Sequence, residues 1–320
     1  MLILLRLIQD GRFHSGQALG DLLGISRGAV WKRLQAVESQ FGLVVQSVRG
    51  RGYRLAHPLH LLDLALLAGS DQGEKWPIHL HEKLDSTNAE ALRLVSAGAQ
   101  APLVVLAEQQ TAGRGRRGRK WVSPFAENLY YSMAWPVAGG AQQLQGISLV
   151  VGLAVLSTLR AFGVDEAGMK WPNDIVVRGR KIAGVLLELV GDLSDLCHVV
   201  VGVGVNVNML AVGDEIDQPW TSMLIEAGAA VERNAFVREL NSQLAEYLDR
   251  HQRLGFSAFI AEWDCSDICS GRVVTLATAA REEVGVACGV DETGGLVLLV
   301  DGVRKIFSGG EISLRLQNDT

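Results

Sequence analysis

The run GRGRRGRKW, from Gly113 to Trp121, constrains the fold of this chain more than any other short segment. It follows the apolar stretch APLVVLAEQQ, which predicts a buried strand, so a cationic, glycine-rich loop leaves a sheet at this point. The glycines satisfy the G-x-G-x-x-G spacing, but a dinucleotide-binding fold needs a helix to open at the loop. Here RKWVSPF follows, with a proline and no helical period, and Arg119 stands where a P-loop needs lysine. Neither nucleotide motif applies.

The loop holds five cations and no acid in nine residues. Like charges at this density repel one another, so the loop is expected to hold an anion rather than to be a solvated surface. Glycines let backbone amides approach the anion closely, and arginine guanidinium groups match phosphate oxygens. The residues alone leave two targets open, which are a nucleic acid backbone and a small polyphosphate around which the loop folds.

Residues 1–63 differ in charge from the rest of the chain. They carry eight Lys and Arg against four Asp and Glu, a net charge of +4; the whole chain carries −5, so the remainder carries −5 − 4 = −9. Such asymmetry indicates a basic module attached to an acidic body. Within the module, HSGQALGDLLGISRGAVWKRLQAVESQFG predicts two short helices, the second with Ser26 as its N-cap. The buried stripe expected on this second helix comprises Val30, Leu34, Val37 and Phe41.

The next segment, LVVQSVRGRGYRL, predicts a β-hairpin with a basic tip. Helix, turn, helix and hairpin together are typical of a winged helix-turn-helix, whose second helix reaches base edges and whose hairpin reaches phosphates or the minor groove. The alternative is a small helical domain with a solvated basic surface. The residues predicted to bind DNA are Arg27, Lys32, Arg33, Arg49 and Arg51.

The pattern changes again after residue 63, and we predict a winged helix-turn-helix domain over 1–63, a linker over 64–78, a central domain over 79–270 and a C-terminal domain over 271–320. Short turns such as VVRGRKIAG make some neighbouring central strands antiparallel, which favours a mixed sheet. The C-terminal segment alternates short strands with Gly and Asp turns and predicts a small β-barrel. No apolar run reaches the length of a membrane span. The four cysteines fit no disulfide framework or zinc pattern, which favours reduced thiols and a cytoplasmic location.

Three further segments join the cationic loop in one ordered pattern: DSTN at 85–88, KWPND at 170–174 and RKIAGVLLE at 180–188. With these motifs the chain resembles the biotin protein ligases, and with its N-terminal module it resembles their bifunctional bacterial members, which also repress the biotin operon. The resemblance extends over essentially all 320 residues. It implies an α/β multi-domain (α+β) fold: a winged helix-turn-helix, a central mixed-sheet ligase domain like the class II synthetases, and a small SH3-like β-barrel.

The resemblance also implies a two-step reaction. Biotin's carboxylate attacks the α-phosphate of ATP to give biotinyl-5′-adenylate and pyrophosphate; a lysine of a biotin carboxyl carrier protein domain of acetyl-CoA carboxylase then attacks the mixed anhydride. Because the first step brings two anions together, positioned cations and Mg²⁺ are what it needs. The loop would therefore wrap biotin and the ATP phosphates rather than DNA. A homodimer carrying the adenylate would bind operator DNA and repress biotin biosynthesis.

Residue roles are carried over from the family motifs. Lys181 would bridge biotin's carboxylate and the α-phosphate, Arg116 would neutralise phosphate charge, and Asp174 would bind magnesium or orient the acceptor amine. The residues expected to bind biotin are Ser86, Thr87, Asn88, Gln110, Arg114, Gly115, Arg116, Trp121, Lys181 and Gly184. The residues expected to bind ATP are Arg116, Arg119, Lys170, Asn206, Trp220 and Arg315.

Several of these residues have a plainer structural interpretation. Thr87-x-x-Glu90 also fits a capping box for the following helix, and this role and the contact with biotin can hold at once. Trp220 could instead be a core tryptophan, and Arg315 a surface arginine on a strand. The glutamine that contacts biotin's ureido group could be Gln109 in place of Gln110. Two other functions also stay open: a biotin-sensing repressor without transfer activity, and a related ligase for lipoate.

Overall fold

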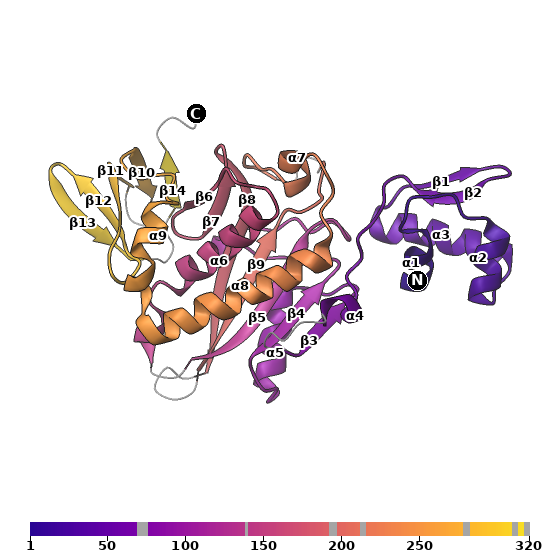
Figure 1. Ribbon diagram of the computed structural model, residues 1–320, viewed down its shortest axis with the longest axis horizontal. Helices are drawn as coiled ribbons and strands as arrows, with labels where there is room; N and C mark the ends of the chain where they lie inside the picture. Colours follow the sequence, from indigo (N-terminus) through magenta and orange to yellow (C-terminus); the bar gives the residue numbers. More distant parts are fainter. Residues whose placement is uncertain are drawn as a thin grey trace.

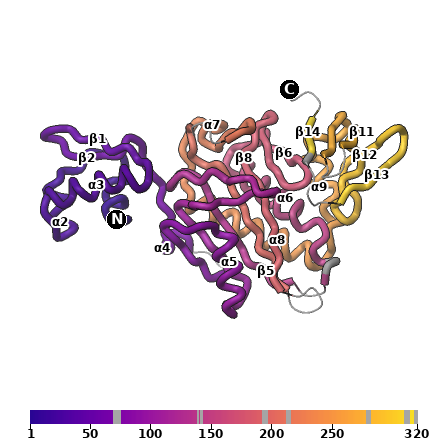
Figure 2. The backbone as a smooth tube through the Cα atoms, turned by 180° about the vertical axis from the view of Figure 1, so that it is seen from behind, coloured from indigo at the N-terminus to yellow at the C-terminus, as the bar shows by residue number. Residues whose placement is uncertain are grey.

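The computed structural model describes residues 1–68, 76–137, 140–191, 197–211, 216–277, 282–308 and 313–316. Three units follow one another along its longest axis: a small helical unit at the N-terminus, a large central sheet with helices, and a smaller sheet at the C-terminus (Figure 1). The same order is seen from behind (Figure 2). No helix in these ranges is both long enough and apolar enough to cross a membrane.

The N-terminal unit has the order of elements expected for a winged helix-turn-helix. Its elements are α1 (Leu2–Ile8), α2 (Gly16–Leu23), α3 (Arg27–Phe41), β1 (Val45–Val48) and β2 (Gly52–Leu55). Ser26 caps α3 as predicted, because its hydroxyl accepts a hydrogen bond from the amide of Ala29 at 3.2 Å. The whole expected stripe of α3 is buried, and β1 pairs antiparallel with β2. The turn between these strands presents Arg49 and Arg51 at exposed positions.

The central sheet is mixed, as the sequence predicts. Its strands are β3 (Ile78–His81), β4 (Leu103–Ala107), β5 (Leu129–Val137), β6 (Ala167–Lys170), β7 (Asp174–Val177), β8 (Arg180–Gly191) and β9 (Cys197–Val205). They lie in the order β3-β4-β5-β9-β8-β7-β6, with β3 and β4 parallel and the other described neighbours antiparallel. Short turns therefore suffice for the hairpins that carry most of the site.

Helices cover both faces of the central sheet. The remaining helices are α4 (Leu64–Leu67), α5 (Thr87–Ser96), α6 (Ile147–Ala161), α7 (Met223–Ala227), α8 (Arg233–Leu254) and α9 (Ile260–Asp264), with 3₁₀ turns η1 (Arg116–Gly118), η2 (Ala141–Leu144) and η3 (Phe256–Phe259). On β4, Val104 and Leu106 belong to the core that includes α6 and α8, whereas Leu103 and Val105 pack with Ala91 of α5. Successive strand residues point to opposite faces, so α5 lies on one face and α6 and α8 on the other.

The C-terminal unit consists of short strands, as predicted, and these pair antiparallel in one sheet. They are β10 (Val273–Ala277), β11 (Glu282–Val290), β12 (Leu296–Val300), β13 (Val303–Phe307) and β14 (Ser313–Leu316), in the order β13-β12-β11-β10-β14. The Trp171 indole donates a hydrogen bond to the carbonyl of Gly294 at 3.1 Å and so joins this sheet to the central unit. The resemblance to the biotin protein ligases also includes the segment SGGEISLR, residues 308–315, which lies partly outside the described residues.

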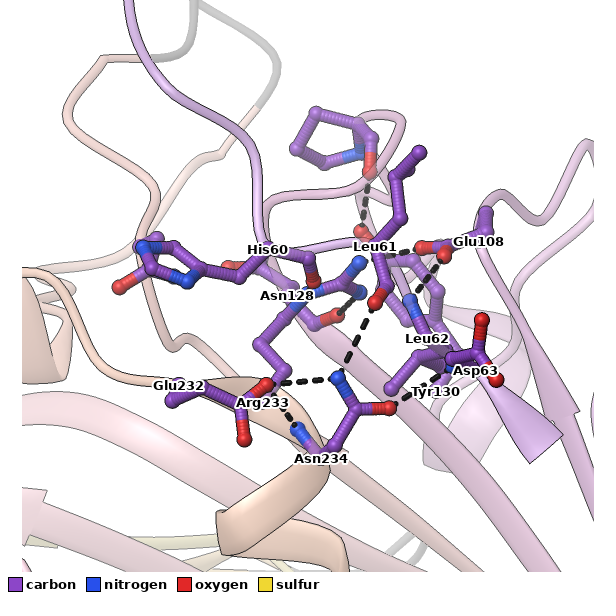
Figure 3. A network of polar contacts seen from close by, with 12 residues as sticks. His60, Leu61, Leu62, Asp63, Glu108, Asn128, Tyr130, Glu232, Arg233 and Asn234 are labelled. Atoms are coloured by element: carbon purple, nitrogen blue, oxygen red, sulfur yellow. Dashed lines mark hydrogen bonds and ion pairs between the residues drawn. The ribbon is translucent and has the colours of Figure 1, made fainter. Parts of the chain in front are cut away.

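A buried polar network fixes the chain where the N-terminal unit meets the central sheet (Figure 3). The fully buried guanidinium of Arg233, at the start of α8, forms an ion pair with Glu108. It also donates hydrogen bonds of 2.9 Å to the carbonyls of His60 and Asn128. Glu108 in turn accepts a hydrogen bond from the amide of Leu62 at 2.6 Å. The entry into the predicted linker is thus held by side chains from two distant parts of the chain.

Apolar contacts join the same two units. The rings of Phe41, on α3, and Phe125 lie 4.1 Å apart between centroids, and Phe125 and Ala126 belong to the core of the N-terminal unit. Phe125 follows the cationic loop by only four residues. Within the predicted linker 64–78, α4 occupies the first residues, residues 69–75 lie outside those described, and β3 begins at Ile78.

Candidate active site

The cationic loop folds back on itself between β4 and β5. The amide of Gly115 donates to the carbonyl of Arg119 at 2.7 Å, and the amide of Trp121 donates to the carbonyl of Gly113 at 2.9 Å. A Cβ on Gly113 would lie 2.6 Å from the Trp121 carbonyl oxygen, so a side chain there would block this closure. The loop borders a cavity of about 330 Å³. The cavity is lined by Arg114, Gly115, Arg116, Arg117, Gly118, Leu186 and Glu188.

Polar side chains from three segments meet next to Glu188, which lines this cavity and bonds Asn88. The side-chain oxygen Oε1 of Gln110 accepts hydrogen bonds from the backbone amide and the hydroxyl of Thr87, at 2.8 and 3.2 Å. Ser132 of β5 donates to the Thr87 hydroxyl at 2.7 Å or to the Asn88 carbonyl oxygen at 2.5 Å. Ser86, Thr87 and Asn88 are all buried. The structure therefore brings the DSTN motif together with Gln110. Of the two candidate glutamines, Gln109 and Gln110, it is the Gln110 side chain that bonds Thr87.

The capping box expected at Thr87 and Glu90 is wrong. Ser86 occupies the N-cap position of α5 and makes no side-chain capping bond. The Thr87 hydroxyl points to Gln110 instead, and Glu90 forms an ion pair with Arg93 at 2.7 Å. The tertiary partners of Thr87 are Gln110, which follows β4, and Ser132 on β5, so they could not enter a pattern that considers four consecutive residues.

An ion pair joins the two hairpin motifs. Lys181 Nζ lies 2.6 Å from Asp174 Oδ1, across the β7–β8 hairpin, and both side chains are mostly buried. Gly184 pairs in register with Asp174, and a Cβ on it would lie 3.1 Å from Lys181 Cε. The lysine is thus an inward-facing group with a fixed partner and not an exposed hairpin lysine.

The loop contacts this hairpin through Arg116 and Trp121. Arg116 donates to the side-chain oxygen Oδ1 of Asn173 at 3.0 Å. Burial lowers the pKa of its guanidinium, while the nearby Asp174 carboxylate opposes that shift. Lys181 Nζ lies 5.5 Å from the centre of the Trp121 ring. The Trp121 indole N–H is buried without a hydrogen-bond partner among the described residues. It packs against β9, because a Cβ on Gly204 would lie 2.9 Å from it.

The residues predicted to bind ATP are only partly brought together. Trp220 pairs with Lys181 in an isolated bridge, so its backbone lies next to that of Lys181. Asn206 is buried and its amide donates to the Thr221 carbonyl at 3.0 Å, which gives it a structural contact already. Lys170 ends β6 at a half-buried position, and Arg119 is exposed on the loop. Arg315, the last residue predicted to bind ATP, lies in the C-terminal unit. It is exposed on β14, where it pairs with Thr275 of β10.

Asp174 is the one predicted metal ligand. In the part of the chain that the structure describes, no group of three or more His, Cys, Asp or Glu side chains could hold a metal ion. A magnesium ion that arrives with a nucleotide needs only one or two protein carboxylates, because phosphate oxygens and waters complete its shell. A single inward carboxylate beside the loop fits that requirement.

Sequence reasoning missed four polar residues that position the predicted ones. Asn173 holds Arg116, and Ser132 links Thr87 to Asn88. The other two are Ser123, which accepts a hydrogen bond from Gln110, and Glu188, which bonds both Asn88 and Arg114. Asn173 lies in the KWPND motif and Glu188 ends the RKIAGVLLE motif, so their presence in these motifs could have indicated a role in the site. Ser123 and Ser132 had none, because only the folded sheet brings them to the site.

The N-terminal unit presents all five residues predicted to bind DNA at exposed positions: Arg27, Lys32, Arg33, Arg49 and Arg51. Arg51 also lies 4.3 Å from the centre of the Phe13 ring, which orients the hairpin tip. Trp31 lies on α3 together with Lys32 and Arg33, is 48 % exposed, and was not predicted as a DNA contact. An exposed aromatic ring beside Lys32 adds an apolar surface to the basic one.

Three stretches of the chain match family models, in chain order. Residues 1–54 match an HTH domain, residues 80–206 the biotin/lipoate A/B protein ligase family, and residues 269–315 the biotin protein ligase C-terminal domain. Among solved structures, the biotin protein ligase from Aquifex aeolicus in complex with biotin and ATP has a TM-score of 0.66 and 28% identity, and the match covers 75% of this chain and 99% of that chain. Fold and site together define a biotin protein ligase that carries a DNA-binding domain.

Full-length relatives narrow the class further. The bifunctional ligase/repressor BirA of Salmonella typhimurium is 39% identical, over 98% of this chain and 97% of the relative. The BirA of Escherichia coli is 38% identical over 98% and 96%, and that of Bacillus subtilis is 30% identical over 92% of both chains. The chain belongs to the family of the bifunctional ligase/repressors. The prediction of a biotin ligase joined to a DNA-binding repressor is confirmed.

Proposed function

We propose that this chain transfers biotin to a lysine of a biotin carboxyl carrier protein domain through biotinyl-5′-adenylate, and that the cationic loop, the DSTN motif and the Lys181–Asp174 pair form the site. The observation that carries the assignment is that the loop contacts the hairpin and that the segment just before the loop contacts the DSTN motif. Arg116 and Trp121 reach the β7–β8 hairpin, while Gln110 reaches the DSTN motif.

Biotin's polar head suits the buried amide and hydroxyl groups. Thr87, Asn88 and Gln110 supply both donors and acceptors, and the ureido ring of biotin offers both in turn. Buried polar groups discriminate strongly against a ligand that lacks matching partners. Lipoate has no ureido ring, so this set of groups favours biotin over lipoate.

The first step forms a bond between a carboxylate oxygen and the α-phosphorus of ATP and breaks the bond to pyrophosphate. Lys181 and Arg116 are the cations placed to neutralise the charge that this step concentrates. Lys181 is held by Asp174 before the ligands arrive, which keeps the ammonium at a fixed position. Magnesium bound with ATP would supply further neutralisation of phosphate charge, and Asp174 is the residue that would hold it.

The second step forms an amide between the acceptor lysine and biotin and expels AMP. The attacking amine must be neutral and must approach the carbonyl carbon past the loop. Asp174 lies on the same hairpin as Lys181 and is the carboxylate placed to orient that amine. The adenylate reacts with water, so a loop that covers it also prevents its loss.

For repression we assign α3 and the β1–β2 turn to operator DNA. A homodimer with two-fold symmetry would match a palindromic operator and double the number of phosphate contacts. The adenylate-bound form would be the one that dimerises, so that ligand supply controls the biotin biosynthesis genes. ATP, carrier protein and DNA share the cytoplasm, which is the compartment we propose.

The test is a transfer assay with the full chain, biotin, ATP, magnesium and a biotin carboxyl carrier domain. We expect one labelled acceptor lysine, with pyrophosphate released before AMP. Lys181→Gln should slow pyrophosphate release about 100-fold or more, the scale on which removed transition-state contacts act. Arg178→Gln is the matched control on the same hairpin, because Arg178 is exposed and its ion pairs are with Glu166 and Glu226 rather than with Asp174 or Lys181. An unlabelled acceptor would support the alternative of a sensor without transfer activity.

A further inference from the structure

Glu188 is an acid in a cavity that is built for an anion. It lines the same cavity as the loop residues from Arg114 to Gly118. Both biotin and ATP carry negative charge, so a carboxylate here repels the ligands unless a cation neutralises it. Glu188 therefore needs a role other than holding the charged part of a ligand.

Two contacts define the position of this carboxylate. From below, the Asn88 amide donates to Glu188 Oε2 at 2.8 Å. From the loop, the Arg114 guanidinium donates to the same oxygen at 3.2 Å. Asn88 is fixed in turn, because it is buried, its carbonyl oxygen lies 2.5 Å from the Ser132 hydroxyl, and a Cβ on Gly202 would lie 2.3 Å from that oxygen. The floor of the site and the loop are thus joined through one carboxylate.

The loop is tied at a second point. Arg116 donates to Asn173 at 3.0 Å, and Asn173 itself donates to the Val185 carbonyl at 2.6 Å. The two ties differ in strength. The Arg114–Glu188 pair is partly open to solvent, with side chains 46% and 26% exposed, so it is weak and can open. Arg116 is the more deeply buried arginine.

We propose that Glu188 is a positioning residue that latches the cationic loop over the site through Arg114 and so slows escape of biotinyl-adenylate. The inference rests on the proposed function, since it needs an adenylate to retain. The latch opens first because its pair is the more exposed of the two ties. Asn88 keeps the carboxylate in place while the loop is open, so the loop returns to the same position.

The test is the rate at which preformed biotinyl-adenylate leaves the full-length protein, followed by stopped-flow fluorescence. Glu188→Gln keeps an oxygen for the Asn88 amide but removes the charge that Arg114 needs. We expect release about two- to five-fold faster, the range for a partly exposed ion pair. Glu166→Gln, which removes a carboxylate from an exposed pair elsewhere, is the matched control and should release at the wild-type rate.

A double-mutant cycle isolates the latch from other effects. Arg114→Gln should accelerate release by itself, and adding Glu188→Gln should accelerate it no further, because the contact is already lost. Equal release from wild type and Glu188→Gln, or fully additive effects in the double variant, would overturn the latch. Failure of the wild-type protein to form adenylate at all would overturn the proposed function and this inference with it. Arg114→Gln changes an exposed residue, so it tests the contact even if Glu188→Gln does not fold.

Discussion

Replacing Arg233 with methionine is expected to lower the free energy of unfolding by about 3–5 kcal/mol, the usual cost of removing one partner from a buried ion pair. Arg233 is fully buried, and methionine retains most of the apolar stem while it removes the whole guanidinium. Among the described residues, Glu108 is then left as a buried charge with the Leu62 amide as its remaining hydrogen-bond donor. The carbonyls of His60 and Asn128 each lose a donor as well, so the upper part of this range is expected.

Urea unfolding followed by tryptophan fluorescence measures the loss. Arg238→Met is the matched control, because Arg238 lies on the same helix at an exposed position and donates one hydrogen bond, to the Leu66 carbonyl at 2.8 Å. Its loss should cost no more than about 1 kcal/mol. Trypsin should also cleave near the predicted linker faster in Arg233→Met, since the network holds that segment. A change below about 1 kcal/mol in Arg233→Met would refute the role given to the network.

Three further predictions concern the site, the buried Asp267 that pairs with Met169 of β6, and the DNA-binding surface. Gly204→Ala places a Cβ 2.5 Å from Trp121 Cε2, so the ring must move, and calorimetry should show biotin binding weakened about ten-fold or more. Burial raises the pKa of Asp267 from 3.8 to about 6, so the folded state holds this proton more tightly and stability falls as the pH rises through that window. Asp267→Asn should therefore be roughly 1–3 kcal/mol more stable than wild type at alkaline pH, an advantage that vanishes below the unfolded pKa; equal stability at both extremes would exclude the effect. Lys32→Ala should lower the slope of log affinity against log salt by about 1 on a random duplex, and an unchanged slope would remove Lys32 from the phosphate contacts.

The Thr87 hydroxyl shows where local patterns stop being informative. Four consecutive residues fit a capping box, yet the hydroxyl bonds Gln110 and Ser132, which are brought to it by β4 and β5. The Thr87 hydroxyl can bond either the helix N-terminus or a tertiary partner. It bonds the tertiary partners, because a buried hydroxyl needs a hydrogen-bond partner and these lie beside it. The Ser26 cap was predicted correctly because α3 begins at the surface, where no such competitor exists.

The amino-acid sequence by itself determined the winged helix-turn-helix, the antiparallel character of much of the central sheet, the cationic loop and the ligase family. Caps, apolar stripes, glycine turns and ordered motifs are local, and each segment carries its own signal. Only the tertiary structure decided which side chains meet. Asn88 and Glu188 are 100 residues apart, and Glu108 and Arg233 are 125 residues apart. Contacts over such distances depend on the order of the strands in the sheet, and no spacing along the chain records that order.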